Sequence, residues 1–103
     1  MVTTIALLYR VACAQEIRTP AQIEGCRAMG RFARTIVRKR DAGYSMEKSM
    51  ELADKMASEE ELSDSTTTMM ENLTASIYAE YKNMNEDEVW HEVHENCLRG
   101  WLP

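Results

Sequence analysis

The sequence predicts an all-α protein, a compact four-helix bundle, and two observations support this fold class. Apolar side chains recur at steps of three and four residues through four segments of the 103-residue chain, which places them on one face of a helix. Residues that favour helix ends stand at the borders of these segments. No segment alternates apolar and polar residues as a half-buried strand does. Because the connections are short, we expect consecutive helices to run antiparallel.

The best-delimited helix is expected over Thr19–Gly43. Thr19, Pro20 and Gln22 form a capping box with proline at the first helical position, and Gly43 is a residue type that ends helices. The apolar face holds Cys26, Met29, Phe32, Ala33, Ile36 and Val37. The opposite face carries an arginine stripe, which consists of Arg27, Arg31, Arg34 and Arg38. This stripe is a candidate surface for a binding partner.

A second helix should begin after Ser45, because serine caps helix N-termini. Its apolar positions are Met46, Met50, Ala53, Met56 and Ala57. The segment Ser58–Ser65 contains three consecutive glutamates and has no apolar face, which is typical of a solvated connection. We expect this segment to join the second helix to the third.

The third helix is expected to start within Asp64–Thr68 and to follow a long apolar stripe. The stripe consists of Met70, Leu73, Ile77, Tyr81 and Met84. Glu80 falls within this stripe, and Arg40 falls on the apolar side at the end of the first helix. A charge that faces a core without a partner is costly, so we expect a buried ion pair between Arg40 and Glu80. The alternative is that both side chains reach water from helix ends.

The fourth helix has signals at both of its ends. Asn85 with Glu88 three residues later has the form of a capping box, and Gly100 should end the helix. The apolar positions are Val89, Trp90, Val93, Cys97, Leu98 and Trp101. In an antiparallel bundle the end of this helix lies beside the start of the first one. Cys97 and Cys26 would then stand at the same level, close enough for a disulfide.

Residues 1–14 differ from the rest of the chain, and we interpret them as a signal peptide or a disordered N-terminal tail; a native N-terminal helix is a further alternative. The apolar run over residues 5–9 is too short to span a bilayer, and Ala12, Cys13 and Ala14 match the small-residue pattern of a cleavage site. Residues 15–103 remain as a single helical domain. Removal of Cys13 would leave an even pair of cysteines, as expected of a bundle stapled by one disulfide. In a reducing compartment the same pair would be two buried thiols.

The net charge of −5 conceals two regions of opposite charge. Residues 1–40 carry eight basic and two acidic side chains, whereas residues 41–95 carry three basic and fifteen acidic ones. We expect acidic helices to lie beside the basic one and neutralise it. A nucleic-acid site on the arginine stripe would require that face to stay uncovered, so nucleic acid is a disfavoured partner.

The sequence offers one candidate metal site, a weak one formed by His91 and His94. They stand one helical turn apart, with Glu88 and Glu95 nearby, but the sequence identifies no third ligand. The alternative is one half-buried packing histidine and one surface histidine. The sequence also lacks a glycine-rich phosphate loop and a nucleophile elbow, and both helical cysteines point to the core side. We therefore expect no enzymatic activity and no cofactor.

Four short motifs point to a family. They are Cys26-x-x-Met29, the turn Arg40-Asp41-Ala42-Gly43-Tyr44-Ser45, the pair Ile77-Tyr78 and the late Cys97. On these motifs the chain resembles a group of small exported all-helical proteobacterial proteins of unknown function with a single disulfide. The resemblance implies a signal peptide over residues 1–14 and pairing of Cys26 with Cys97. It does not transfer any activity to this chain.

The function predicted from the sequence is therefore binding of another protein, in the periplasm or after secretion, without membrane contact once a signal is removed. Two alternatives stay open. One is a metal-binding protein that uses His91 and His94. The other is a cytosolic nucleic-acid binder that uses the arginine stripe from Arg27 to Arg38.

Overall fold

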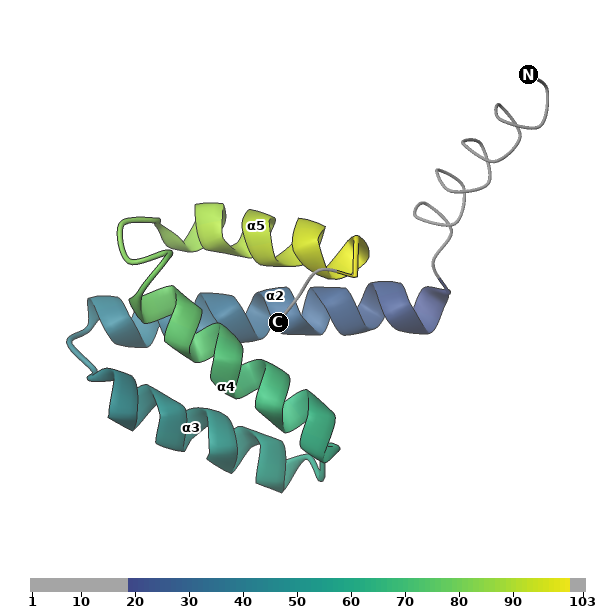
Figure 1. The fold of residues 1–103 in the computed structure, drawn as a ribbon, viewed down its shortest axis with the longest axis horizontal. Helices are drawn as coiled ribbons and strands as arrows, with labels where there is room; N and C mark the ends of the chain where they lie inside the picture. Colours follow the sequence, from purple (N-terminus) through teal and green to yellow (C-terminus); the bar gives the residue numbers. More distant parts are fainter. Residues whose placement is uncertain (1–18, 101–103) are drawn as a thin grey trace, which may run out of the picture.

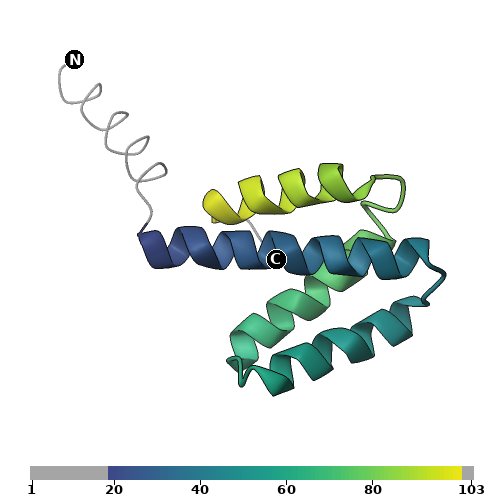
Figure 2. The ribbon, with the colours of Figure 1, turned by 180° about the vertical axis from the view of Figure 1, so that it is seen from behind.

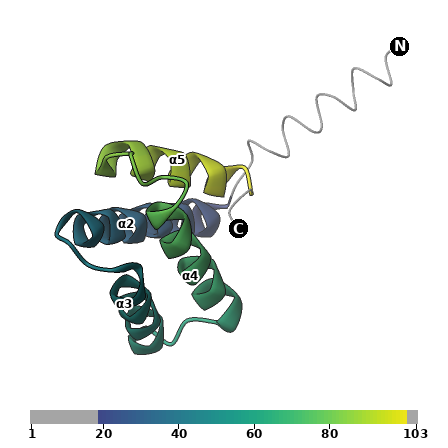
Figure 3. The same cartoon turned by 60° about the vertical axis from the view of Figure 1, so that its left-hand side comes forward.

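The computed structural model describes residues 19–100, which form four α-helices (Figure 1). They are α2 (Pro20–Asp41), α3 (Met46–Glu59), α4 (Asp64–Tyr78) and α5 (Glu86–Leu98). The long helix α2 runs through the middle of the fold, and α5 lies antiparallel along it. The hairpin of α3 and α4 lies on the other side of α2, where α4 makes the closer contact (Figures 2 and 3). The predicted all-α four-helix fold is confirmed.

Each helix begins at a side chain that caps its N-terminus. Thr19, Ser45, Ser63 and Asn85 have extended backbones, and each side chain accepts a hydrogen bond from the backbone N–H three residues later. The boxes predicted at Thr19 and Asn85 are both complete, because Gln22 and Glu88 bond back to the cap N–H. Gly43 (φ 95°) and Gly100 (φ 75°) take left-handed conformations just after α2 and α5. Local signals therefore set most of the helix borders.

The core lies where α2 meets α4 and α5. Its fully buried side chains include Ile36 and Val37 of α2, Leu73 and Ile77 of α4, and Val89 and Val93 of α5. The buried residues of α3 are all small: Ala53 is fully buried and Ala57 nearly so, whereas Leu52 and Met56 pack against the core only partly buried. The large buried apolar side chains therefore come from the other three helices.

A hydrogen-bond chain ties the start of α3 to the end of α4. Ser49 is fully buried, and its hydroxyl lies 2.7 Å from the hydroxyl of Tyr78. The Tyr78 hydroxyl in turn donates to the carbonyl oxygen of Tyr44 at 2.7 Å. The face expected for the second helix is therefore partly wrong: Ser49 lies inward, whereas Met46 is 44% exposed.

The Cys26–Cys97 disulfide joins the start of α2 to the end of α5. The two Cα atoms are 5.4 Å apart, within the range that a disulfide spans. The Cys26 side chain is buried, with 6% of its surface exposed. The pairing expected from the antiparallel arrangement of the first and last helices is confirmed.

Two predicted boundaries are wrong. Helix α3 continues to Glu59 and α4 begins at Asp64, so the connection covers only residues 60–63 rather than Ser58–Ser65. Helix α4 ends at Tyr78 rather than near Met84, although Tyr81 and Met84 still pack against the core. Residues 79–85 form a turn that keeps the apolar spacing of a helix without being one. The apolar spacing in the sequence therefore continues past the end of α4.

Arg40 explains why that turn is stable, and its role corrects the predicted ion pair with Glu80. One terminal nitrogen, Nη1, donates to the carbonyl oxygens of Ile77 (3.1 Å) and Tyr81 (2.9 Å), and Nη2 donates to that of Met84 (2.7 Å). The Arg40 Nε pairs with the carboxylate of Asp41 at 3.1 Å. Glu80 is exposed in the turn. The guanidinium thus satisfies one carbonyl at the end of α4, where helices have unpaired acceptors, and two carbonyls of the turn that follows.

No helix in the described part of the chain is long and apolar enough to cross a bilayer. The expected signal peptide or tail over residues 1–14 lies outside the described residues, as do Cys13 and Trp101.

Candidate functional site

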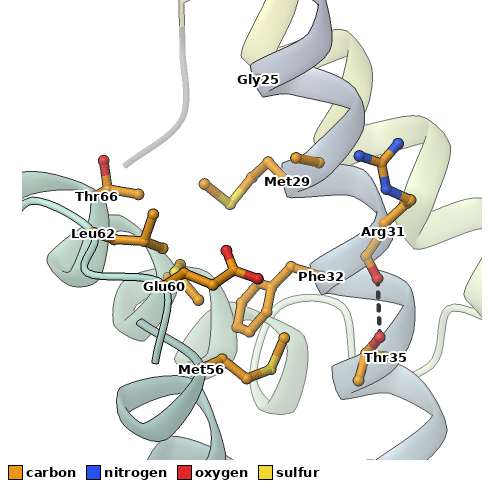
Figure 4. A pocket seen from close by; sticks show the side chains of 11 residues that line it. Gly25, Met29, Arg31, Phe32, Thr35, Met56, Glu60, Leu62 and Thr66 are labelled. Carbon is orange, nitrogen blue, oxygen red and sulfur yellow. Dashed lines mark hydrogen bonds between the residues drawn. The ribbon is translucent and has the colours of Figure 1, made fainter. Parts of the chain in front are cut away.

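The structure contains a cleft of about 440 Å³ between the first half of α2 and the end of the α3–α4 hairpin at which residues 60–63 join the two helices (Figure 4). We call it the methionine cleft, because Met29, Met56 and Met70 line it together with Phe32 and Leu62. Met70 and Phe32 are nearly fully buried, while Met29, Met56 and Leu62 are half-buried. The cleft is therefore an apolar depression that opens to solvent rather than a closed core cavity.

The wall on α2 follows from helical spacing. Gly25, Met29 and Phe32 recur at steps of four and three residues, so they share one face of the helix. Ala28 and Thr35 border this face and also line the cleft. Small residues occupy the outer positions, and larger ones lie deeper.

The opposite wall depends on the tight turn that ends α3. Glu61 has a left-handed backbone (φ 53°), which is uncommon for a residue with a side chain. The N–H of Leu62 bonds to the carbonyl oxygen of Ala57 at 3.0 Å, and that of Glu61 bonds to Ser58 at 3.2 Å. These bonds are typical of a Schellman ending. They direct Leu62 back toward α2, and its side chain forms part of the cleft (Figure 4).

The charged groups at the cleft are unequally placed. The exposed carboxylate of Glu60 lies in the opening, between the walls (Figure 4). The guanidinium of Arg31 points away from the cleft and pairs with Glu24 at 2.9 Å. The hydroxyl of Thr35 donates to the Arg31 carbonyl oxygen at 3.1 Å. The only charge that faces the opening from among the lining side chains is thus negative.

The lining is suited to binding rather than to bond-breaking chemistry. Methionine side chains are flexible and polarizable, and they adapt to the shape of an apolar partner. None of the lining residues pairs a nucleophile with a general base. The arrangement can bury apolar side chains of a ligand and can attract a cation near Glu60.

Arg34 and Arg38, in the second half of the arginine stripe, are neutralised by α5, as the charge distribution predicted. Arg38 makes a two-pronged contact with Glu86, through Nε at 3.0 Å and Nη2 at 2.8 Å. Arg34 pairs with Asp87 at 2.7 Å and lies over the Trp90 ring. The Arg38 contact lowers the pKa of Glu86 below its ordinary value. In the first half of the stripe, Arg27 and Arg31 pair with Glu24 on their own helix.

His91 and His94 do not share one environment. His91 is exposed. The His94 ring stacks on Trp90 with centroids 4.7 Å apart, and both of its ring nitrogens are buried without a hydrogen-bond partner. Within residues 19–100 no group of three metal-ligating side chains comes together. This arrangement matches the alternative of a packing histidine beside a surface histidine.

Sequence reasoning missed the methionine cleft, although two signals pointed to it. Gly25 interrupts a helix without ending it, and the chain has eight methionines, a residue type that suits adaptable binding surfaces. Neither signal locates a cleft, because the cleft depends on how far the α3–α4 hairpin splays from α2.

Comparison with known proteins adds no relative. No protein-family model, no curated protein and no solved structure matches this chain.

Proposed function

We propose that this chain is an exported helical protein, stapled by its disulfide, that acts by binding another protein through the methionine cleft. The observation that carries the proposal is the cleft itself. An open apolar depression lined by adaptable side chains is the usual form of a site for apolar groups of a partner.

The compartment forms part of the proposal. A disulfide is compatible with the periplasm or the extracellular space, where such bonds persist, and is rare in a reducing cytosol. The resemblance of the sequence to small exported helical proteins supports the same compartment. Export would depend on residues 1–14, which lie outside the described residues.

Binding is favoured over the two alternatives for reasons of charge and geometry. A nucleic-acid site would require an uncovered basic face, but Arg34 and Arg38 pair with acidic residues of α5. A metal site would require converging ligands, but in the part of the chain that the structure describes the His94 ring stacks on Trp90 and its nitrogens have no hydrogen-bond partner.

Site-specific photo-crosslinking in the native periplasm tests the proposal. Ala28 is exposed and lines the cleft, so a photoreactive side chain at this position should capture a discrete protein. The same group at the exposed Glu51, outside the lining, is the matched control. We expect a product from position 28 that disappears when Gly25→Phe fills the cleft. Identical products from both positions would contradict the proposal.

A further inference from the structure

We propose that the occupant of the methionine cleft is a basic amphipathic helix, presented by the partner protein. This inference rests on the proposed function and specifies the chemistry of the partner. Its apolar side chains would enter the cleft, and its lysines or arginines would lie along the acidic wall made by the end of α3 and the start of α4.

The shape and lining of the cleft suit an apolar helix face. Its volume of about 440 Å³ falls within the range of roughly 300–1,000 Å³ typical of ligand sites. Met29 and Phe32 supply one wall from α2, and Met56 and Leu62 supply the other from the hairpin. Helices that dock in such grooves bury a few apolar side chains spaced by three and four residues. The half-buried methionines can adjust to those side chains.

The charge around the cleft selects a cationic partner. Glu59, Glu60, Glu61 and Asp64 are all exposed at the turn that joins α3 to α4. No lysine or arginine occurs between Lys55 and Lys82, and among residues 19–100 the only ion pair made by this wall is that of Glu59 with Lys55, at 4.0 Å. On the α2 side, Arg27 and Arg31 share the carboxylate of Glu24, and the Arg31 guanidinium points away from the cleft. An acidic wall speeds association with a basic segment and disfavours anionic ligands such as fatty acids.

Gly25 provides a second, independent observation. A glycine within a helix costs about 1 kcal/mol relative to alanine. At Gly30 close packing explains the cost, because an added Cβ would meet the Trp90 indole at 2.7 Å. At Gly25 an added Cβ would meet nothing within 4 Å. Packing among the described residues therefore does not require this glycine. The missing side chain leaves space at this point of the cleft lining.

Titration with two designed peptides tests the inference. The probes are a helical peptide of leucine and lysine, with leucines on one face, and its counterpart in which glutamate replaces lysine. We expect the leucine–lysine peptide to bind with one-to-one stoichiometry in calorimetry, and more weakly as salt increases. Gly25→Phe should reduce its affinity at least about tenfold, since a filled pocket loses its anchor contacts.

Two charge variants separate the cleft from general attraction. Glu60→Lys should reduce the affinity for the leucine–lysine peptide about three- to tenfold, because it reverses the charge in the opening. Glu51→Lys makes the same change on α3 outside the lining and should have a smaller effect. Both positions are exposed, so the variants should keep the wild-type melting temperature and circular dichroism spectrum.

Three outcomes would overturn the inference. The first is equal weakening by Glu60→Lys and Glu51→Lys with no effect of Gly25→Phe, which would indicate unspecific charge attraction. The second is tighter binding of the leucine–glutamate peptide. The third is a dimer of this chain in sedimentation that Gly25→Phe dissociates, which would make the cleft a self-interface. The proposed function has its own test: it fails if crosslinking at position 28 captures no discrete protein, whatever the peptides show.

Discussion

Gly30 and Trp90 lie in direct contact across the interface of α2 and α5. A Cβ on residue 30 would stand only 2.7 Å from the indole Nε1 of Trp90. The indole is held in place by the stacked ring of His94 and by the guanidinium of Arg34, whose central carbon lies 5.7 Å from the ring centroid. The close approach of the two helices therefore depends on this glycine, one turn after the disulfide at Cys26.

The two helix glycines should respond in opposite directions to alanine. Gly30→Ala forces the indole to move and should lower the free energy of unfolding by about 1–3 kcal/mol. Gly25→Ala meets open space and should raise it by about 0.5–1 kcal/mol, because alanine favours the helix. Thermal melts of the two variants beside the wild type measure both effects. Equal responses of the two variants would contradict the packing described here.

Arg40 should matter far more than Glu80. Arg40→Met removes the donors from three carbonyl oxygens, those of Ile77, Tyr81 and Met84. Since hydrogen bonds to charged groups contribute about 1.5–3 kcal/mol each and are only partly replaced by water, we expect a loss of at least about 2 kcal/mol. Glu80→Gln is the control and should change little, because Glu80 is exposed. Denaturant unfolding of both variants tests this role. An Arg40–Glu80 ion pair would instead predict similar losses in the free energy of unfolding for the two variants.

Two glutamates should give opposite pH dependence. The contact with Arg38 lowers the pKa of Glu86 in the folded state, so its stabilisation exists above 4.5, the ordinary pKa, and is lost as pH falls further. The pKa of Glu71 is raised by a hydrogen bond with Asp54 and by the repulsion between the two carboxylates. Its contribution to stability is therefore present below 4.5 and is lost as pH rises through the raised pKa.

The matched variants follow from these signs. At pH 7, Glu86→Gln should lower the melting temperature and Glu71→Gln should raise it. Both differences should shrink when the melts are repeated at about pH 3, because acid shifts both wild-type carboxyls toward the neutral form that glutamine mimics. A difference from wild type that is the same at both pH values would contradict the assigned contacts.

Local signals in the sequence predicted the helix starts because capping depends on residues within one turn of each other. Thr19, Ser45 and Asn85 were identified in this way. The end of α4 was missed because Arg40, distant in sequence, stabilises the turn that follows. The inward position of Ser49 was missed for the same reason, since its partner is Tyr78. The methionine cleft depends on the angle between α2 and the hairpin, which no local pattern encodes.

The disulfide should contribute a large part of the stability of this small domain. It joins residues separated by 71 positions, and the loop-entropy model gives about 4 kcal/mol for a loop of that length. Cys97→Ser should therefore lower the melting temperature strongly, and reductant should do the same to the wild type. Reductant should then have no effect on the variant. If neither the Cys97→Ser substitution nor reductant lowers the melting temperature, the bundle does not depend on the bond.

The most direct test of the account is the intact mass of the protein in each cell compartment, after expression of the whole sequence in a bacterial host that exports proteins. The account predicts a periplasmic or secreted product shortened at its N-terminus. Alkylation under denaturing conditions should leave that product unmodified until reductant is added, after which it should take up label at two cysteines. A full-length cytosolic product whose three cysteines alkylate without reductant would contradict the account.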